Sequence, residues 1–266
     1  MSDNPPYKLT GRFSNAQAYD RHTGRFSRPL AGQFIDFSGV KDGERLLDIG
    51  CGTGSLAFTA AALTRRSEIV GIDPSASFIE YARSRTNDPR LSFEIGNALS
   101  LPYPDGSFDK CLSLLVIQFI QDVRRAVSEM RRVTRQGGTV AACVWDRDND
   151  ELHTVFWDSA AELDPEGKQM RDARAYVGGQ LSALWVESGF AGVEETALVI
   201  SPEFESFDDY WTPLVGGQGL SSTYLASLPP DRQESLHARV RKKMLGASPD
   251  RSFRIKGKAW AVRGVR

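Results

Sequence analysis

Cysteine is scarce in this sequence, and long apolar runs are absent. The three cysteines, Cys51, Cys111 and Cys143, are odd in number and far apart. This spacing excludes a disulfide framework and a Cys-x-x-Cys metal site, and it suits a reducing compartment. The longest apolar run, residues 111–120, is too short to span a bilayer. Because residues 1–10 also lack the apolar core of a signal peptide, we expect a cytoplasmic protein without a membrane span.

An excess of charge is absent as well. The chain has 33 Lys and Arg against 34 Asp and Glu, for a net charge of -1. This balance excludes a globally basic nucleic-acid-binding protein. Only residues 232–266 are strongly basic. Two interpretations of that stretch stay open: a solvated helix face with an edge strand, or a basic rim that favours an anionic ligand. No His-x-x-x-His pair or acidic cluster with ligand spacing occurs, so no metal site is expected.

Short apolar strands alternate with helices in the first half of the chain. Strands are predicted at 45–49, 68–72, 91–95, 108–115 and 139–145, and helices at 15–37, 55–63, 75–85 and 122–133. The helix at 15–37 is expected to be broken at Gly24 and Pro29, and the pair Gly137-Gly138 is expected to lead into the fifth strand. Ser75, after Pro74, is expected to cap the helix at 75–85. This alternation, with strands that are apolar throughout, predicts a parallel sheet covered on both faces.

The second half is less regular. It predicts helices at 151–163, 180–188 and 231–245 and strands at 193–200 and 252–265. With no repeat and no clean linker, the chain is expected to form one domain with a cap at about 203–248, inserted before the last strand. Aromatic residues of this cap either pack it on the core or line an apolar ligand pocket. Gly216, Gly217 and Gly219 predict that the cap is mobile.

A glycine-rich loop follows the first strand. Gly50, Gly52 and Gly54 occur between that strand and a predicted helix. Glycine allows a tight turn and a close approach of a ligand, and the helix N-terminus provides unpaired N–H groups. Asp73 ends the next strand, where a carboxylate can accept both hydroxyls of a ribose. These features are common to nucleotide-binding α/β folds.

Three details favour S-adenosylmethionine over a dinucleotide. The spacing is G-x-G-x-G, and Ser55 replaces the third glycine of the dinucleotide pattern. Asp48, two residues before the first glycine, can hold the amino-acid part of the cofactor. After the third strand, Asn97 can meet an adenine amino group while Ala98 and Leu99 pack on the ring.

Together, LLDIGCGTG, GIDPS and GNALSLPYPDGSFD resemble the class I S-adenosylmethionine-dependent methyltransferases. The most similar branch is the one related to ubiquinone and menaquinone C-methyltransferases. The resemblance covers roughly residues 15–146, the expected cofactor-binding core of a single methyltransferase domain 1–266. It implies a Rossmann-like, mostly parallel seven-stranded sheet with helices on both faces, an antiparallel last strand, and S-adenosylhomocysteine as the product.

The resemblance also implies contacts to the cofactor. Asp48, the glycine loop and Asp73 would hold its methionine and ribose parts, Asn97 and its neighbours its adenine, and Leu115 and Gln118 would flank the sulfonium. Where the family usually has Asp, this chain has Asn97, so weaker binding is expected. The full predicted set is Tyr19, Asp48, Gly50, Cys51, Gly52, Gly54, Asp73, Pro74, Ser75, Asn97, Ala98, Leu99, Leu115 and Gln118.

No catalytic base is obligatory, because the cofactor carries an activated methyl group. Oxygen and carbon acceptors often need a proton removed. Three candidates are Tyr19, His22 and His153. In similar methyltransferases an N-terminal helix closes over the cofactor and contributes a tyrosine. Tyr19 fits that role, or it only packs the helix on the sheet. His22 and His153 are candidate bases or ordinary surface residues.

The predicted function is transfer of a methyl group from S-adenosylmethionine to a small molecule, apolar or anionic. One alternative is a methyltransferase-like protein that binds the cofactor but serves as a regulator or scaffold. Another is a nicotinamide-dependent oxidoreductase on the same fold, which the Ser55 spacing disfavours. An RNA or protein methyltransferase is disfavoured because no appended RNA-binding motif occurs. The tetrapeptide Asn4-Pro5-Pro6-Tyr7 resembles an amide-methylation motif, but it precedes the predicted sheet and is interpreted as coincidence.

Overall fold

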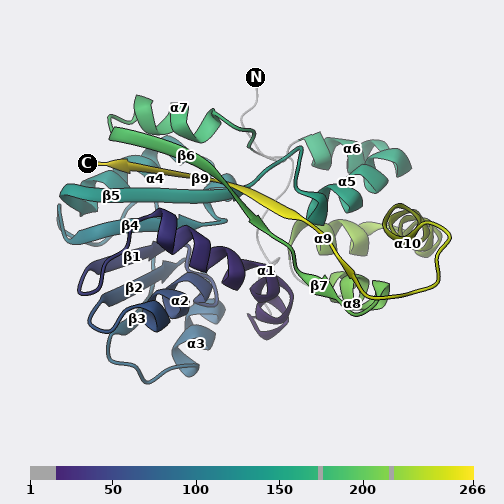
Figure 1. Cartoon of the computed structure of the whole chain (residues 1–266), viewed down its shortest axis with the longest axis horizontal. Coiled ribbons are helices and arrows are strands. Elements are labelled where there is room, and N and C mark those ends of the chain that lie inside the picture. The colour runs from purple at the N-terminus through teal and green to yellow at the C-terminus, as the bar shows by residue number, and fades with distance from the viewer. Residues whose placement is uncertain (1–15, 173–175, 216–218) are drawn as a thin grey trace.

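A seven-stranded sheet runs through the molecule in the order β3-β2-β1-β4-β5-β9-β6 (Figure 1). The computed structural model describes residues 16–172, 176–215 and 219–266. The seven strands are β1 (Arg45–Ile49), β2 (Glu68–Asp73), β3 (Leu91–Ile95), β4 (Phe108–Leu114), β5 (Thr134–Trp145), β6 (Ala191–Ile200) and β9 (Gly257–Val265). Neighbouring strands from β3 to β5 pair in parallel, and β9 is antiparallel to both β5 and β6. The predicted sheet with an antiparallel last strand is confirmed.

Helices cover both faces of this sheet. One face packs against α1 (Ala16–Phe37), α2 (Ser55–Leu63) and α3 (Ala76–Ser84), and the other against α4 (Val123–Val133) and α7 (Gln180–Glu187). Successive side chains of a strand point to opposite faces. Leu46 accordingly packs in the cluster with Phe34, while the next residue, Leu47, packs in the cluster with Trp185. Strands with two buried faces explain why their sequences are apolar without alternation.

Two predictions about where a helix or strand is interrupted or begins are wrong. The helix predicted to break at Gly24 and Pro29 is continuous as α1, with Pro29 inside it. The fully buried Leu30 and Phe34 anchor this helix on the sheet, and that packing outweighs the local cost of proline. The glycine pair expected to precede the fifth strand lies within β5, where the pairing register shifts and Gly137 has a φ of 73°. Glycine there accommodates a bulge rather than ending the strand.

A helical layer lies beyond one end of the sheet (Figure 1). It contains α5 (Glu151–Leu163), α6 (Pro165–Asp172), α8 (Phe207–Trp211), α9 (Leu220–Ser227) and α10 (Pro230–Leu245). Two short helices are η1 (Ile117–Phe119), which follows β4, and η2 (Thr212–Leu214), which follows α8. Helices α8 to α10 fall between β6 and β9 in sequence, as the predicted cap requires. The sequence did not predict α6, nor the small sheet of β7 (Glu203–Phe204) and β8 (Phe253–Arg254), which divides the expected last strand.

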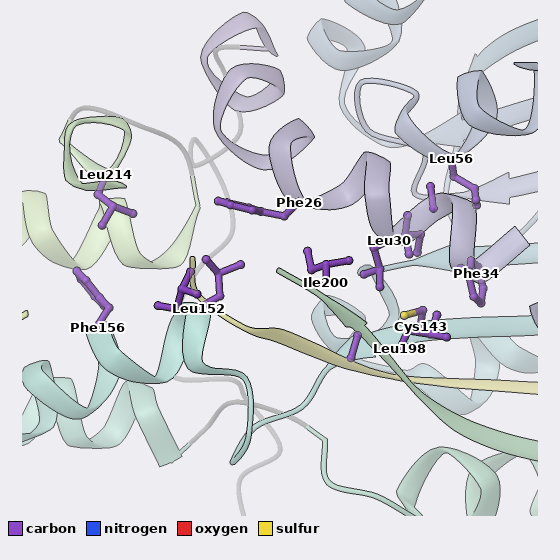
Figure 2. Close-up of a cluster of buried hydrophobic side chains, with 14 of the residues drawn as sticks. Phe26, Leu30, Phe34, Leu56, Cys143, Leu152, Phe156, Leu198, Ile200 and Leu214 are labelled. Carbon is purple, nitrogen blue, oxygen red and sulfur yellow. The ribbon is translucent and has the colours of Figure 1, made fainter. Parts of the chain in front are cut away.

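The helical layer shares its core with the sheet. Figure 2 shows Leu152 and Phe156 of α5 and Leu214 of η2 in the same apolar cluster as Phe26 of α1 and Ile200 of β6. Two of the three glycines that predicted cap mobility, Gly216 and Gly217, lie outside the described residues. Among the described helices none is long and apolar enough to cross a membrane.

Candidate functional site

The glycine-rich loop connects β1 to α2 in a conformation that requires glycine. Gly50, Gly52 and Gly54 all have positive φ angles, of 67°, 54° and 90°. A Cβ atom on Gly50 would lie 2.4 Å from Cγ1 of Val116, whereas one on Gly52 would meet only ordinary contacts. The loop is fixed to β2, because the N–H groups of Gly50 and Cys51 both donate to the carbonyl oxygen of Ile72. The backbone at Gly52 is therefore both rigid and accessible.

Asp73 joins this loop to the start of α3. Its carboxylate accepts hydrogen bonds from the N–H of Gly52 at 3.0 Å and from the N–H of Ser75 at 2.8 Å. Burial raises the pKa of Asp73, and these two N–H donors oppose that rise. The hydroxyl of Ser75 accepts from the N–H of Phe78 and caps α3, as predicted. Pro74 between them is exposed. Asp73 is thus a buried acceptor beside an accessible backbone.

Asp48 is a buried carboxyl group with a strongly raised pKa and one oxygen atom without a partner among the described residues. It lies below the loop, 3% exposed, at the N-terminus of α2, where the N–H of Ala57 donates to it. Desolvation, and to a lesser degree the charge of Asp73, raises its pKa to about 8. Its Oδ2 atom has no hydrogen-bond partner among the described residues. A buried polar atom without a partner is costly, so its retention here indicates a missing donor or cation.

Helix α1 crosses this loop and is pinned to it. Asp20 is buried, accepts from the hydroxyl of Thr53 at 3.1 Å, and pairs with Arg28 at 2.7 Å and Arg85 at 3.4 Å. The ring of Tyr19, the residue before Asp20, packs on Phe78 with centroids 4.8 Å apart. A Cβ on Gly52 would lie 3.8 Å from Cε1 of Tyr19. Tyr19 therefore lies over the glycine loop, where the sequence predicted a covering tyrosine.

The other predicted contacts differ in what their side chains face. The thiol of Cys51 packs toward Gly71 inside the sheet, so only its backbone faces the loop surface. The Oδ1 atom of Asn97 accepts from the N–H of Leu99 at 2.9 Å, which closes a local turn after β3. Ala98, next to it, is half-buried against the core. The side chain of Asn97 thus already has a structural role that the sequence did not predict.

A cavity of about 160 Å³ lies next to the loop, between the sheet and the helical layer. Leu115 and Gln118, which follow β4, line it, and Leu115 is the one residue other than glycine with a positive φ, 62°, among those the structure describes. Such backbone strain is concentrated at functional sites. Tyr19 also lines the cavity, so this residue contacts both the loop and the cavity. Aromatic side chains form much of the remaining lining, together with leucines and polar residues: Phe26, Phe119, Trp145, Phe156, Trp157 and Tyr210.

Both candidate histidines line this cavity, and the third does not. His22 comes from α1 and His153 from α5. Burial first, and then the neighbouring His153 and Arg25, lowers the pKa of His22 to about 4. His153 has its Nδ1 atom 2.5 Å from Oδ2 of the buried Asp150. His237 packs instead between Phe207 and Trp211 in the helical layer.

Several site residues were missed by sequence reasoning. Asp20 is buried beside the loop, Ser222 is buried in the cavity wall, and Asp150 is buried behind His153. The i, i+3 spacing of Asp150 and His153 at a helix start was available in the sequence and pointed to this pair. Nothing local distinguishes Ser222, because its place in the cavity wall depends on how α9 packs. No group of three or more His, Cys, Asp or Glu that could hold a metal occurs within the described ranges.

An ion pair connects α1 to the helical layer beside the cavity. Arg25 makes two hydrogen bonds to Asp209 of α8, at 2.9 and 3.0 Å, and its guanidinium lies 5.0 Å from the ring centroid of Phe204. Because both side chains are partly exposed, we expect Arg25→Ala to change the free energy of unfolding by less than about 1 kcal/mol. We expect a larger local effect, namely faster amide hydrogen exchange in α8.

Hydrogen exchange measured by mass spectrometry tests this prediction. Arg124→Ala, which removes the exposed pair with Glu187, is the matched control and should leave α8 unchanged. Equal exchange in α8 for both variants would show that the Arg25–Asp209 pair does not hold the cavity edge.

Comparison with known proteins shows what this chain and its fold are similar to. Residues 47–142 match the family described as "Methyltransferase domain". The chain is 32% identical over 180 residues to an uncharacterized 37.1 kDa protein in a transposon of Streptomyces fradiae, covering 62% of this chain and 48% of that protein. It is 31% identical over 149 residues to the 2-phytyl-1,4-naphtoquinone methyltransferase of Synechocystis sp., covering 53% of this chain and 63% of that one.

The chain thus spans about half to two thirds of the length of these relatives. Among solved structures, it resembles phosphoethanolamine N-methyltransferase 2 of Haemonchus contortus, in complex with phosphomonomethylethanolamine and S-adenosylhomocysteine. The TM-score is 0.60 at 20% identity, over 94% of this chain and 56% of the other. The resemblance to class I methyltransferases, with quinone methyltransferases among the sequence relatives, is confirmed.

Proposed function

We propose that this chain binds S-adenosylmethionine at the glycine loop and transfers its methyl group to a small molecule held in the adjoining cavity. The observation that carries the proposal is the buried, unpartnered Oδ2 of Asp48 beneath an accessible loop. A group with a positive charge or an N–H donor satisfies that atom, and the ammonium of the cofactor's methionine part has both. The residues of this loop therefore fit the cofactor.

The roles follow from the contacts. Gly52 gives the methionine part access to the backbone, and Asp48 holds that part from below. Asp73, already fixed by two N–H donors, accepts from the ribose hydroxyls.

Leu99 and Ala98 pack on the adenine, and Asn97 shapes the turn after β3. Tyr19 closes the loop from above, and Leu115 with Gln118 separates the loop from the cavity. The other predicted contacts, Gly50, Gly54, Cys51, Pro74 and Ser75, act through the loop backbone and the start of α3.

The cofactor supplies a methyl group on a sulfonium, already activated toward nucleophiles. The protein's part is to orient the acceptor and to exclude water. Residues 203–215 and 219–248, together with α5, close the cavity over the acceptor. The aromatic lining favours an apolar, planar acceptor, and the name of the Synechocystis relative, which acts on a naphthoquinone, agrees with that choice.

Calorimetric titration with S-adenosylhomocysteine, alongside NADH and NADPH, tests the proposal. We expect micromolar or tighter binding of S-adenosylhomocysteine and none of the nicotinamide nucleotides. Binding of a nicotinamide nucleotide alone would make the chain an oxidoreductase. Binding of S-adenosylhomocysteine without any labelled methyl transfer to a panel of small acceptors would support the regulatory or scaffolding alternative.

A further inference from the structure

The start of α5 holds a histidine and a carboxylate in a fixed arrangement. Asp150 immediately precedes the helix, and its side chain is completely buried. Its Oδ2 lies 2.5 Å from Nδ1 of His153. A carboxylate at Nδ1 keeps the proton on that nitrogen, so the lone pair of the neutral ring is on Nε2. The imidazole thus has the tautomer of a general base, with its orientation set by Asp150.

The loop before α5 is itself rigid. Asp146, 1% exposed at its side chain, accepts from the N–H groups of Asp148 and Asn149 and pairs with Lys258 at 2.9 Å. The hydroxyl of Tyr210 donates to the carbonyl oxygen of Leu152 at 3.2 Å. These contacts fix the backbone on both sides of Asp150, so the carboxylate and the imidazole keep their relative position without a bound ligand.

The two histidines of the cavity have different surroundings. Charged and titratable groups around His153 are Asp150 on its own helix, His22 across the cavity on α1, and Arg147 after β5, which pairs with Asp148 at 3.0 Å. His22 has no carboxylate partner in the described contacts, and burial keeps it neutral near pH 7. Two side chains of one type can take different roles in proton transfer when their surroundings differ. His153 can accept a proton, and His22 stays an uncharged hydrogen-bonding group.

The cavity wall also contains a hydroxyl group without a hydrogen-bond partner among the described residues. Ser222 of α9 is 4% exposed, and its Oγ has no hydrogen-bond partner among the described residues. The ring of His153 itself packs on Trp145, with centroids 5.0 Å apart, and lies 6.4 Å from the ring of Phe26. An aromatic slot with a histidine base and a free hydroxyl matches a planar aromatic molecule that carries oxygen substituents.

From this geometry we infer that the acceptor is an aromatic hydroxyl compound and that His153 is the catalytic base that removes its proton. Asp150 positions His153, and Ser222 binds a second polar substituent of the acceptor. The inference rests on the proposed function. In the step, the hydroxyl proton moves to Nε2 of His153, and the oxygen forms a bond to the methyl carbon. The carbon–sulfur bond breaks with its electron pair left on sulfur. His153 then returns the proton to water.

Methylation of four probes by the full chain tests this inference. Two are hydroxylated arenes, 2-naphthol and 1,4-naphthohydroquinone, and two lack a hydroxyl, indole and phosphoethanolamine. We expect transfer to at least one hydroxylated arene and to neither of the others. In His153→Gln we expect kcat to fall by about 10²–10⁴-fold with KM changed a few-fold. The rate of this variant should continue to rise with pH toward about 10, where a phenol ionises by itself, whereas the wild-type rate levels off earlier.

Two further variants separate the roles. Asp150→Asn should lower kcat and remove the Nδ1–H signature of His153 in ¹⁵N NMR of the protein with no ligand. Ser222→Ala should raise KM by about 5–30-fold with kcat unchanged. His237→Gln, in the helical layer, is the control and should match wild type. Every variant should bind S-adenosylhomocysteine within about threefold of wild type.

The outcomes distinguish two failures. Absence of S-adenosylhomocysteine binding to wild type would refute the proposed function itself. With that binding intact, an unchanged kcat and pH profile in His153→Gln would overturn the assignment of the base. Transfer only to indole or phosphoethanolamine, or to no probe, would overturn the assignment of the acceptor class.

Discussion

Replacing Asp73 with asparagine lowers the affinity for S-adenosylhomocysteine by at least about 100-fold. A hydrogen bond to a charged group contributes about 1.5–3 kcal/mol, and the proposed role gives Asp73 two ribose hydroxyls. Loss of about 3 kcal/mol corresponds to a factor of about 10² in the dissociation constant. The amide also places an N–H₂ group where the N–H of Gly52 or Ser75 now donates, which disturbs the loop further.

Titration calorimetry at pH 7.5 measures this effect. The control is Asp158→Asn on α5, a half-exposed carboxylate away from the loop, which should bind as wild type does. Circular dichroism of both variants checks that the fold is retained. A folded Asp73→Asn protein with wild-type affinity would show that the ribose is held elsewhere.

Asp48→Asn has opposite effects on stability and on binding. The folded protein raises the pKa of this carboxyl from 3.8 to about 8, so between these values the folded state binds more protons than the unfolded state. Stability of the ligand-free protein therefore falls as pH rises from about 4 to 8, by about 1.4 kcal/mol per pH unit from this group. Asparagine does not ionise, so this loss disappears in the variant.

Thermal unfolding without ligand tests the stability half. At pH 8 the variant keeps the stability that wild type has lost through Asp48, less about 1–3 kcal/mol for a buried amide donor without a partner. We therefore expect Asp48→Asn to unfold about 5–10 °C above wild type at this pH. At pH 4 to 5, where the wild-type carboxyl is protonated, the difference should vanish or reverse. A difference that does not depend on pH would show that the carboxyl of Asp48 is not protonated in the folded protein.

Calorimetry in two buffers of different ionisation enthalpy tests the binding half. If the cofactor's ammonium contacts Asp48, binding ionises this carboxyl and releases close to one proton at pH 7. Asp48→Asn should release none and should bind S-adenosylhomocysteine about 100-fold more weakly, because a charge-assisted contact is lost. Equal proton release by wild type and variant would remove Asp48 from the methionine site.

The sequence by itself determined the sheet and the conformation of the glycine loop. The G-x-G-x-G turn needs positive φ at three positions, and only glycine adopts these without strain, so a short string of residues specifies that geometry. Strand and helix periodicity likewise comes from neighbours in sequence. The capping role of Ser75 was predicted correctly for the same reason. Pro29 misled the prediction because its local penalty was visible in the sequence and the packing of α1 was not.

Tertiary structure alone decided the cavity and the surroundings of the side chains that line it. The lining comes from α1, the ends of β4 and β5, α5, α8 and α9, segments that extend from Tyr19 to Ser222 in the sequence. The burial of His22, which lowers its pKa, depends on how these segments pack. The spacing of Asp150 and His153 was visible in the sequence, but the complete burial of the Asp150 side chain was not. The raised pKa of Asp48 has the same origin. Burial and charge act through space, so the sequence names these residues, and the packing of distant segments sets their chemistry.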